Sequence, residues 1–145
     1  MYMRKGYGLI TPNDYECIAR LQKAHTLLSL VAEWALEKQK EFALMFIERA
    51  IEELNKAKDI CCRLPTIDKL VTMVEGTCLI REPQDTDTCI ESVFEPLIKD
   101  LKLAKKELSE EHFEEASRDH VIPTMREIAN LIAGFGCWVT IYGRE

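Results

Sequence analysis

The chain has 145 residues, of which 47% are hydrophobic and 30% are charged, and its formal net charge is −6. This length and composition predict a single helical domain over residues 1–145. The acidic balance argues against direct binding of nucleic acid and against a general affinity for anionic membranes, because both need clustered lysine and arginine.

The N-terminal segment does not have the pattern of a secretion signal, since Gly6, Gly8 and Pro12 stand where an apolar core would be. No stretch of the chain reaches the roughly 18 to 20 apolar residues that span a bilayer. We therefore expect a cytoplasmic protein that makes no membrane contact. Residues 7–10 are rich in β-branched and aromatic side chains, which predicts a short extended segment.

The longest predicted element begins at Thr11, Pro12 and Asp14, which supply an N-cap, a first-turn proline and a capping box. Residues 13–64 then contain neither glycine nor proline. A single helix of this length would measure about 78 Å, whereas a compact domain of this size is about 35 to 40 Å across. Either the chain reverses near residues 37–41 as a helical hairpin, or one long helix projects and is covered by a second molecule.

The centre of this element, residues 42–47, consists of six consecutive apolar residues. On a helix they point in every direction around the axis, whereas a helix with one buried face shows an apolar arc of about 100°. The segment 27–62 must therefore be covered on all sides, either as the central helix of a bundle or by another subunit. Aromatic residues and methionine anchor protein interfaces, and the predicted interface residues are Trp34, Phe42, Met45, Phe46 and Ile51.

The middle of the chain shows shorter helical signals. Thr66 is a candidate cap for a helix over residues 67–79, and residues 81–85 read as a loop. Thr88 and Glu91 form a capping box for a helix that reaches about Glu107.

The C-terminal part begins with Ser109, a second candidate cap, and Pro123 either kinks the following helix or starts it afresh. Gly134 is the expected end of the last helix. Residues 137–142 alternate β-branched and aromatic side chains, so they can pair with residues 7–10 as a β-ribbon. The predicted fold class is mainly all-α: a bundle of four to six helices, built on a long helix or helical hairpin over about 12–63, with short extended segments at both ends.

Six cysteines occur in the chain, and none of them forms a C-x-x-C pair. A chain of this length with helical patterning and no secretion signal favours reduced, buried thiols over a disulfide framework. The sequence identifies no cofactor site and no metal site.

Histidine and carboxylates gather around His112, with Glu111, Glu114 and Glu115 close by. Carboxylates three or four residues apart share a helix face and can bind a divalent cation. A metal-dependent all-α hydrolase that uses carboxylates in 110–119 is therefore one alternative function. A solvated acidic first turn explains the same residues without a metal.

Residues 65–96 hold most of the negative excess, and the acidic stretch 82–95 can imitate nucleic acid on the basic site of a partner protein. No nucleophile elbow, phosphate-binding loop or dinucleotide fingerprint is present. We therefore expect a non-enzymatic helical protein-protein interaction module of adaptor or inhibitor type that acts as a homodimer. The hydrolase and the acidic mimic are the alternatives.

Overall fold

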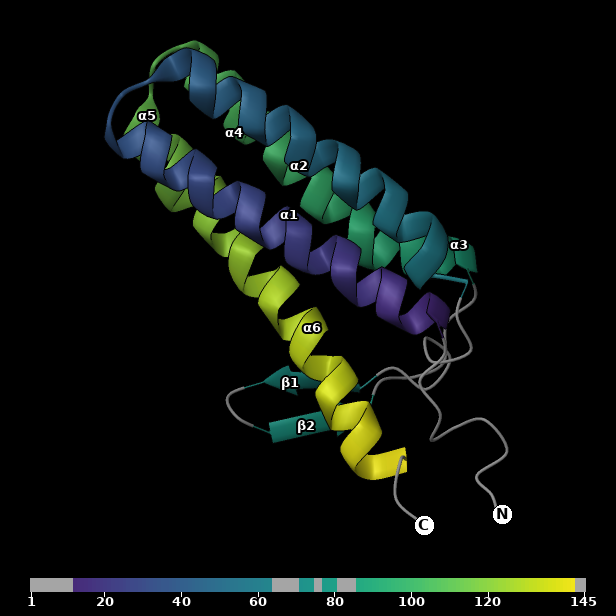
Figure 1. The fold of residues 1–145 in the computed structure, drawn as a ribbon. Helices are drawn as coiled ribbons and strands as arrows, with labels where there is room; N and C mark the ends of the chain where they lie inside the picture. Colours follow the sequence, from purple (N-terminus) through teal and green to yellow (C-terminus); the bar gives the residue numbers. More distant parts are fainter. Residues whose placement is uncertain (1–11, 64–70, 75–76, 81–85, 143–145) are drawn as a thin grey trace.

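The computed structural model describes residues 12–63, 71–74, 77–80 and 86–142, and its described helices form an antiparallel four-helix bundle (Figure 1). The first two helices are α1 (Pro12–Leu36) and α2 (Lys40–Cys61). The third comprises α3 (Thr86–Cys89), η2 (Ile90–Phe94) and α4 (Glu95–Ser109). The fourth comprises α5 (Phe113–Ala116), η3 (Ser117–Val121) and α6 (Ile122–Tyr142). The predicted all-α bundle is confirmed, and the 12–63 segment is a hairpin.

The core lies between the four helices. Around the bundle, α1 contacts α2 and α6, while α4 contacts α2 and the fourth helix. Each helix contributes a stripe at three- and four-residue spacing, which is the pattern of a helix with one buried face. The largest fully buried apolar side chains are Leu21, Leu28, Ile47, Leu54, Phe94, Leu101, Leu108 and Ile128.

The chain reverses between α1 and α2 at Lys38, whose φ is 56°. The Gln39 amide donates to the Trp34 carbonyl at 2.9 Å, and the Lys38 amide donates to the Ala35 carbonyl at 3.0 Å. These two bonds are a Schellman motif, which usually places glycine at the left-handed position. Lysine occupies that position instead, so the sequence left open whether the chain turns, although the turn lies within the predicted residues 37–41.

The turn between the third and fourth helices is built in the same way. Glu111 has a φ of 61°, the His112 amide donates to the Glu107 carbonyl at 2.8 Å, and the Glu111 amide donates to Leu108 at 3.0 Å. Ser109 closes the third helix instead of capping the fourth, since its hydroxyl donates to the Lys105 carbonyl. Both turns lie at the same end of the bundle (Figure 1).

Replacement of Lys38 by glycine should stabilise the protein by about 0.5 to 1 kcal/mol, because the Cβ of an L-residue is strained in the left-handed region. Urea unfolding monitored by circular dichroism measures this difference. Lys38→Ala is the matched control: it removes the same charge but keeps Cβ, so its stability should stay near that of the native chain. Equal stabilities of the two variants would contradict the account.

The third and fourth helices each contain a π-helical turn at the point where the spacing of buried residues widens to five. Cys89 is followed by Phe94, and Ala116 by Val121, as the next fully buried residue. The Glu95 amide donates to Ile90, and the Ile122 amide donates to Ser117, five residues back. The extra residue per turn keeps both members of each pair facing the core.

A proline stands two positions after each π turn, Pro96 in one helix and Pro123 in the other. Proline has no N–H to donate, and its ring crowds the carbonyl four residues earlier. A wider turn relieves that crowding, so both prolines are accommodated inside continuous helices. Pro123 therefore neither ends one helix nor starts another.

The predicted helix over residues 67–79 is wrong for the part that the structure describes, residues 71–74 and 77–79. The structure has an antiparallel hairpin, β1 (Val71–Val74) and β2 (Thr77–Ile80), with Val71 paired to Ile80 and Val74 to Thr77. The segment is rich in β-branched residues, which favour strands, and this preference prevails over the helical spacing. β1 lies beside α6 (Figure 1).

The predicted terminal β-ribbon is also wrong at its C-terminal side, and Gly134 does not end the last helix. Residues 137–142 continue α6, which ends at Tyr142. Strand propensity depends on context, and here the segment extends an existing helix whose nucleus is already formed. Residues 7–10, the other half of the predicted ribbon, lie outside the described residues.

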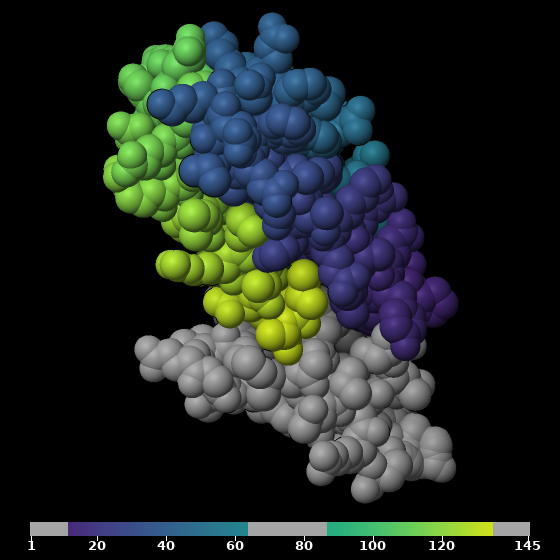
Figure 2. All heavy atoms as spheres, turned by 60° about the vertical axis from the view of Figure 1, so that its left-hand side comes forward, coloured from purple at the N-terminus to yellow at the C-terminus, as the bar shows by residue number. Residues whose placement is uncertain are grey.

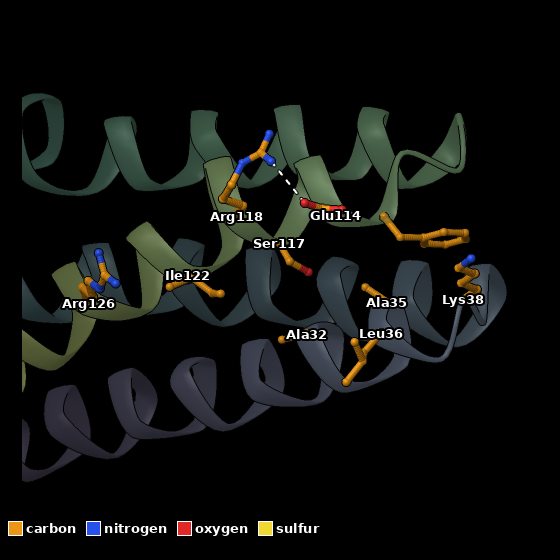
Figure 3. Close-up of a pocket in the computed structure, with 10 residues that line it drawn as sticks. Ala32, Ala35, Leu36, Lys38, Glu114, Ser117, Arg118, Ile122 and Arg126 are labelled. Atoms are coloured by element: carbon orange, nitrogen blue, oxygen red, sulfur yellow. Dashed lines mark hydrogen bonds and ion pairs between the residues drawn. The ribbon is translucent and has the colours of Figure 1, made fainter.

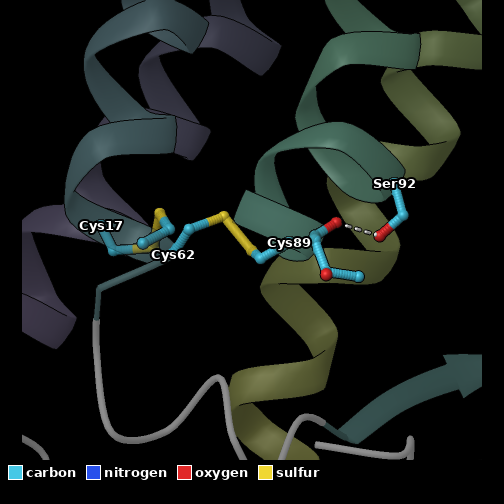
Figure 4. The surroundings of a disulfide bond; sticks show 6 residues. Cys17, Cys62, Cys89 and Ser92 are labelled. Carbon is cyan, nitrogen blue, oxygen red and sulfur yellow. Dashed lines mark hydrogen bonds between the residues drawn. A yellow bond between two sulfur atoms is a disulfide. The ribbon is translucent and has the colours of Figure 1, made fainter. Parts of the chain in front are cut away.

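The expectation of reduced thiols is wrong for four cysteines, which form the disulfides Cys17–Cys61 and Cys62–Cys89 (Figure 4). The first joins α1 to the end of α2, and the second joins the end of α2 to α3. All four side chains are at most 2% exposed. They meet because the start of α1, the end of α2 and the start of α3 lie at the bundle end opposite the two Schellman turns.

Candidate binding surfaces

The predicted interface residues lie on the hairpin of α1 and α2. The Trp34 and Phe42 rings stack across the two helices with their centroids 4.7 Å apart. Phe42 is 47% exposed and Met45 39% exposed, whereas Trp34, Phe46 and Ile51 are half-buried against the core.

The five predicted residues do not form one surface. Phe42 and Phe46 are four residues apart and share a helix face, whereas Ile51 lies about 140° around α2 from Phe46. We call Trp34, Phe42, Met45 and Phe46 the hairpin patch, and Ile51 does not belong to it.

The expectation that this segment is covered on all sides is not met within the described chain. α2 occupies one corner of the bundle rather than its centre, since it packs between α1 on one side and the third helix on the other. Phe42 and Met45 consequently face solvent.

A groove runs between α1 and the fourth helix (Figure 3). Its volume is about 720 Å³, and we call it the α1–α6 groove. Leu36 is 80% exposed at its edge, and Ile122 is 39% exposed opposite. In the space-filling view, α1 and the fourth helix lie side by side (Figure 2). The groove is lined by Ala32, Ala35, Leu36, Lys38, Phe113, Glu114, Ser117, Arg118, Ile122 and Arg126.

Three of these lining residues are cations, and their surroundings differ. Arg118 donates to Asp119 at 2.9 Å and to Glu114 at 3.3 Å. The hydrogen bond with Asp119 raises the pKa of Arg118, and the same bond lowers the pKa of Asp119. Lys38 and Arg126 make no ion pair within the described part of the chain. Their charges are available to a ligand.

A second hollow of about 570 Å³ continues along the same seam toward the other end of the bundle. His25, half-buried, contributes to its wall. Small side chains on α6 leave this part of the seam shallow. The hollow is lined by Gln22, His25, Thr26, Ala129, Ile132 and Ala133.

The predicted carboxylate site does not assemble around Glu111, Glu114 and Glu115. Glu111 pairs with Lys40 at 3.9 Å, and Glu114 pairs with Arg118. Among the described residues, the potential ligand atoms that come within 4.8 Å of one another belong instead to Glu107, Glu110 and His112.

His112 Nδ1 lies 3.6 Å from both carboxylates of this second set, at an exposed turn. The pairing of the exposed His112 with the two glutamates explains this cluster. The cluster is therefore no argument for a metal site. His120 points elsewhere: its Nδ1 lies 2.9 Å from Asp100 Oδ1 on α4.

The acidic stretch 82–95 is described from Thr86 onward. Asp87, Glu91 and Glu95 are exposed there, and Glu95 pairs with Lys58 at 3.6 Å. Glu82 and Asp85 lie outside the described residues.

A buried carboxylate, Glu53, lies between α1 and α2 beside two cations. Glu53 is 4% exposed, and its oxygens lie 3.1 Å from Arg20 and 3.5 Å from Lys23. Burial disfavours the charged form of Glu53, but the hydrogen bond from Arg20 and the charge of Lys23 outweigh it, so the pKa of Glu53 is lowered. This cluster stabilises the hairpin.

No protein family, curated protein or solved structure matches the chain. None of the described helices combines the length and the apolarity that crossing a membrane requires.

All four residues of the hairpin patch were named from the sequence, but the α1–α6 groove was missed. The available signal was the spacing of Arg118, Ile122 and Arg126, which alternates cation and apolar residue at four-residue steps. That spacing indicates a groove only when α1 is known to lie beside the fourth helix.

Proposed function

We propose that the protein is a non-enzymatic helical interaction module that forms a homodimer through the hairpin patch. The supporting observation is the exposure of Phe42 and Met45, beside a tryptophan that is held by ring stacking. Aromatic residues and methionine are enriched in protein interfaces, and rigid aromatic anchors dominate their energetics. A stacked, partly exposed pair loses little side-chain entropy when a partner covers it.

A second copy of the chain is the partner that the surrounding charges favour. The exposed residues of α2 near the patch carry both signs, with Glu41, Glu48 and Glu52 beside Arg49 and Lys56. A two-fold interface brings the same surface of both subunits together, so a mixture of signs can pair across it.

The cytoplasmic location stays a prediction. Disulfides persist chiefly in oxidising compartments, and in the cytosol of some hyperthermophiles. The two disulfides therefore weigh against an ordinary reducing cytosol.

Phe42→Asp should convert the dimer to a monomer, because it places a charge in the middle of the proposed apolar contact. Multi-angle light scattering of the purified protein measures the mass directly. Leu103→Asp is the matched control, since Leu103 is 43% exposed on α4 and lies outside the patch. This variant should remain dimeric.

Each variant replaces a side chain that is already solvent-exposed, so both should fold. Circular dichroism melting checks this. A monomeric native protein at micromolar concentration would refute the homodimer. Retention of the dimer mass by Phe42→Asp would place the interface elsewhere.

A further inference from the structure

The local charge of the α1–α6 groove is positive, opposite in sign to the net charge of the protein. The chain carries a net charge of −6, yet the groove is lined by Lys38, Arg118 and Arg126 against a single carboxylate, Glu114. A site lined by cations within an acidic protein selects an anionic ligand.

The groove also has a hydrophobic floor and edge. Ala32 and Ala35 form part of its α1 side, and Leu36, Phe113 and Ile122 supply larger apolar surface. Leu36, at 80% exposed, is the most exposed large apolar side chain of the described chain. The ligand must therefore be amphipathic, with apolar groups as well as negative charges.

The length of the seam favours a helix over a small molecule as the ligand. The two hollows along it involve α1 from Gln22 to Leu36, which corresponds to about 21 Å or four helical turns. The two lining cations without an ion pair among the described residues, Lys38 and Arg126, lie at opposite ends of the α1–α6 groove (Figure 3). A ligand with one charged head group can meet only one of these positions.

The second hollow permits the close approach of another helix. Ala129 and Ala133 line it on α6, and small side chains at a helix contact shorten the distance between helix axes. A docked helix would thus lie parallel to the seam and contact both hollows.

We propose that the α1–α6 groove binds an amphipathic helix of a partner protein, with acidic side chains that face Lys38 and Arg126, because Arg118 is already paired with Asp119 and Glu114. This is the helix-in-groove mode of recognition. A second copy docking by the same face is disfavoured, because a two-fold axis would bring the same cations toward each other. The inference is independent of the hairpin patch and goes beyond the proposed dimer.

The test uses two fluorescein-labelled helical peptides of about 18 residues, which matches the seam with a short overhang. Both carry leucine at positions i, i+4, i+7 and i+11, flanked by glutamate in one peptide and by lysine in the other. Fluorescence anisotropy should show that the acidic peptide binds at least about 10-fold more tightly. Raising the salt from about 50 to 300 mM should weaken its binding.

Variants of the chain locate the binding site. Lys38→Glu combined with Arg126→Glu should weaken the acidic peptide about 10-fold or more, and Leu36→Ser should weaken both peptides. Lys99→Glu combined with Lys102→Glu is the matched control, because it makes the same charge change at exposed lysines of α4, away from the groove and from the hairpin patch. That control should bind as the native chain does.

Equal binding of the two peptides, no binding of either, or no effect of the charge reversal would overturn the proposal. Dodecanoate provides the competing ligand class. Dodecanoate binding that the Lys38→Glu/Arg126→Glu variant loses, without peptide binding, would reassign the groove to a fatty-acid carboxylate. Light scattering of the same variants keeps the two proposals separate, because groove variants should retain the mass of the native protein.

Discussion

Reduction of the two disulfides is expected to destabilise the bundle more than any single substitution. The bonds close loops with sequence separations of 44 and 27 residues. The chain-entropy relation gives about 4 kcal/mol for the first and about 3.5 kcal/mol for the second. The total is comparable to the 5 to 15 kcal/mol by which domains are usually stable, so the melting temperature should fall by about 15 to 25 °C.

Calorimetry with and without a phosphine reductant measures this effect. Peptide mapping by mass spectrometry without reduction should recover Cys17 joined to Cys61 and Cys62 joined to Cys89. Because Cys61 and Cys62 are neighbours, digestion between them is required to exclude the exchanged pairing. The quadruple variant with alanine at these positions is the control, and its melting temperature should not respond to reductant. An unchanged melting temperature of fully reduced native protein would refute the prediction.

Arg20→Ala should lower the free energy of unfolding by about 2 to 3 kcal/mol at neutral pH, because it leaves the Glu53 carboxylate buried with Lys23 as its remaining cation. Urea unfolding measures the loss. Glu16→Ala removes the exposed partner of Arg20, at 3.3 Å, and serves as control. That control should cost no more than about 0.5 kcal/mol.

The ion pair between Arg20 and Glu53 also predicts that the stability of the protein depends on pH. The folded-state pKa of Glu53 is lowered from the ordinary 4.5, so the stability it contributes is present above pH 4.5 and is lost as pH falls through the folded-state pKa. In Arg20→Ala, burial dominates and should raise the pKa of Glu53, so acid should favour the variant relative to the native chain. The stability difference between the two should be constant at pH values above the raised pKa of the variant, and should shrink as pH falls from there to the lowered pKa of the native chain. A constant difference down to pH 3 would contradict the assignment.

The helical content and the extent of the hairpin could be predicted from apolar spacing and from the absence of glycine and proline in residues 13–64. The turn lies within the predicted residues 37–41, but whether the chain turns there or continues as one long helix could not be predicted. Lys38 and Glu111 adopt left-handed conformations that lysine and glutamate do not prefer, and the pairing of the adjoining helices stabilises them there. Local sequence preferences give no signal for such a turn.

The π turns left a signal in the sequence that spacing rules can detect. Cys89 to Phe94 and Ala116 to Val121 break the three- and four-residue rhythm, and a proline follows each pair two positions later. The β-hairpin and the helical C-terminus were missed for a different reason. Residues 71–74, 77–80 and 137–142 are all rich in β-branched side chains, and their conformations differ because only the last of these segments extends an existing helix.

The cysteine pairing could not be predicted from the sequence, because it depends on which helix ends meet. Cys17 lies near the start of one helix and Cys61 at the end of the next, so they become neighbours only in an antiparallel hairpin. The α1–α6 groove was missed for the same reason, since Leu36 and Ile122 come from helices that meet only through the fold.

The adjacent cysteines Cys61 and Cys62 place two covalent rings in tandem along the chain, one closed by each disulfide. The second ring encloses residues 63–88, including β1 and β2. A protease that cuts the backbone once within this ring would leave a nicked chain of unchanged mass on a non-reducing gel. Its two fragments would separate only after reduction, so the ring retains the third and fourth helices on the hairpin after cleavage.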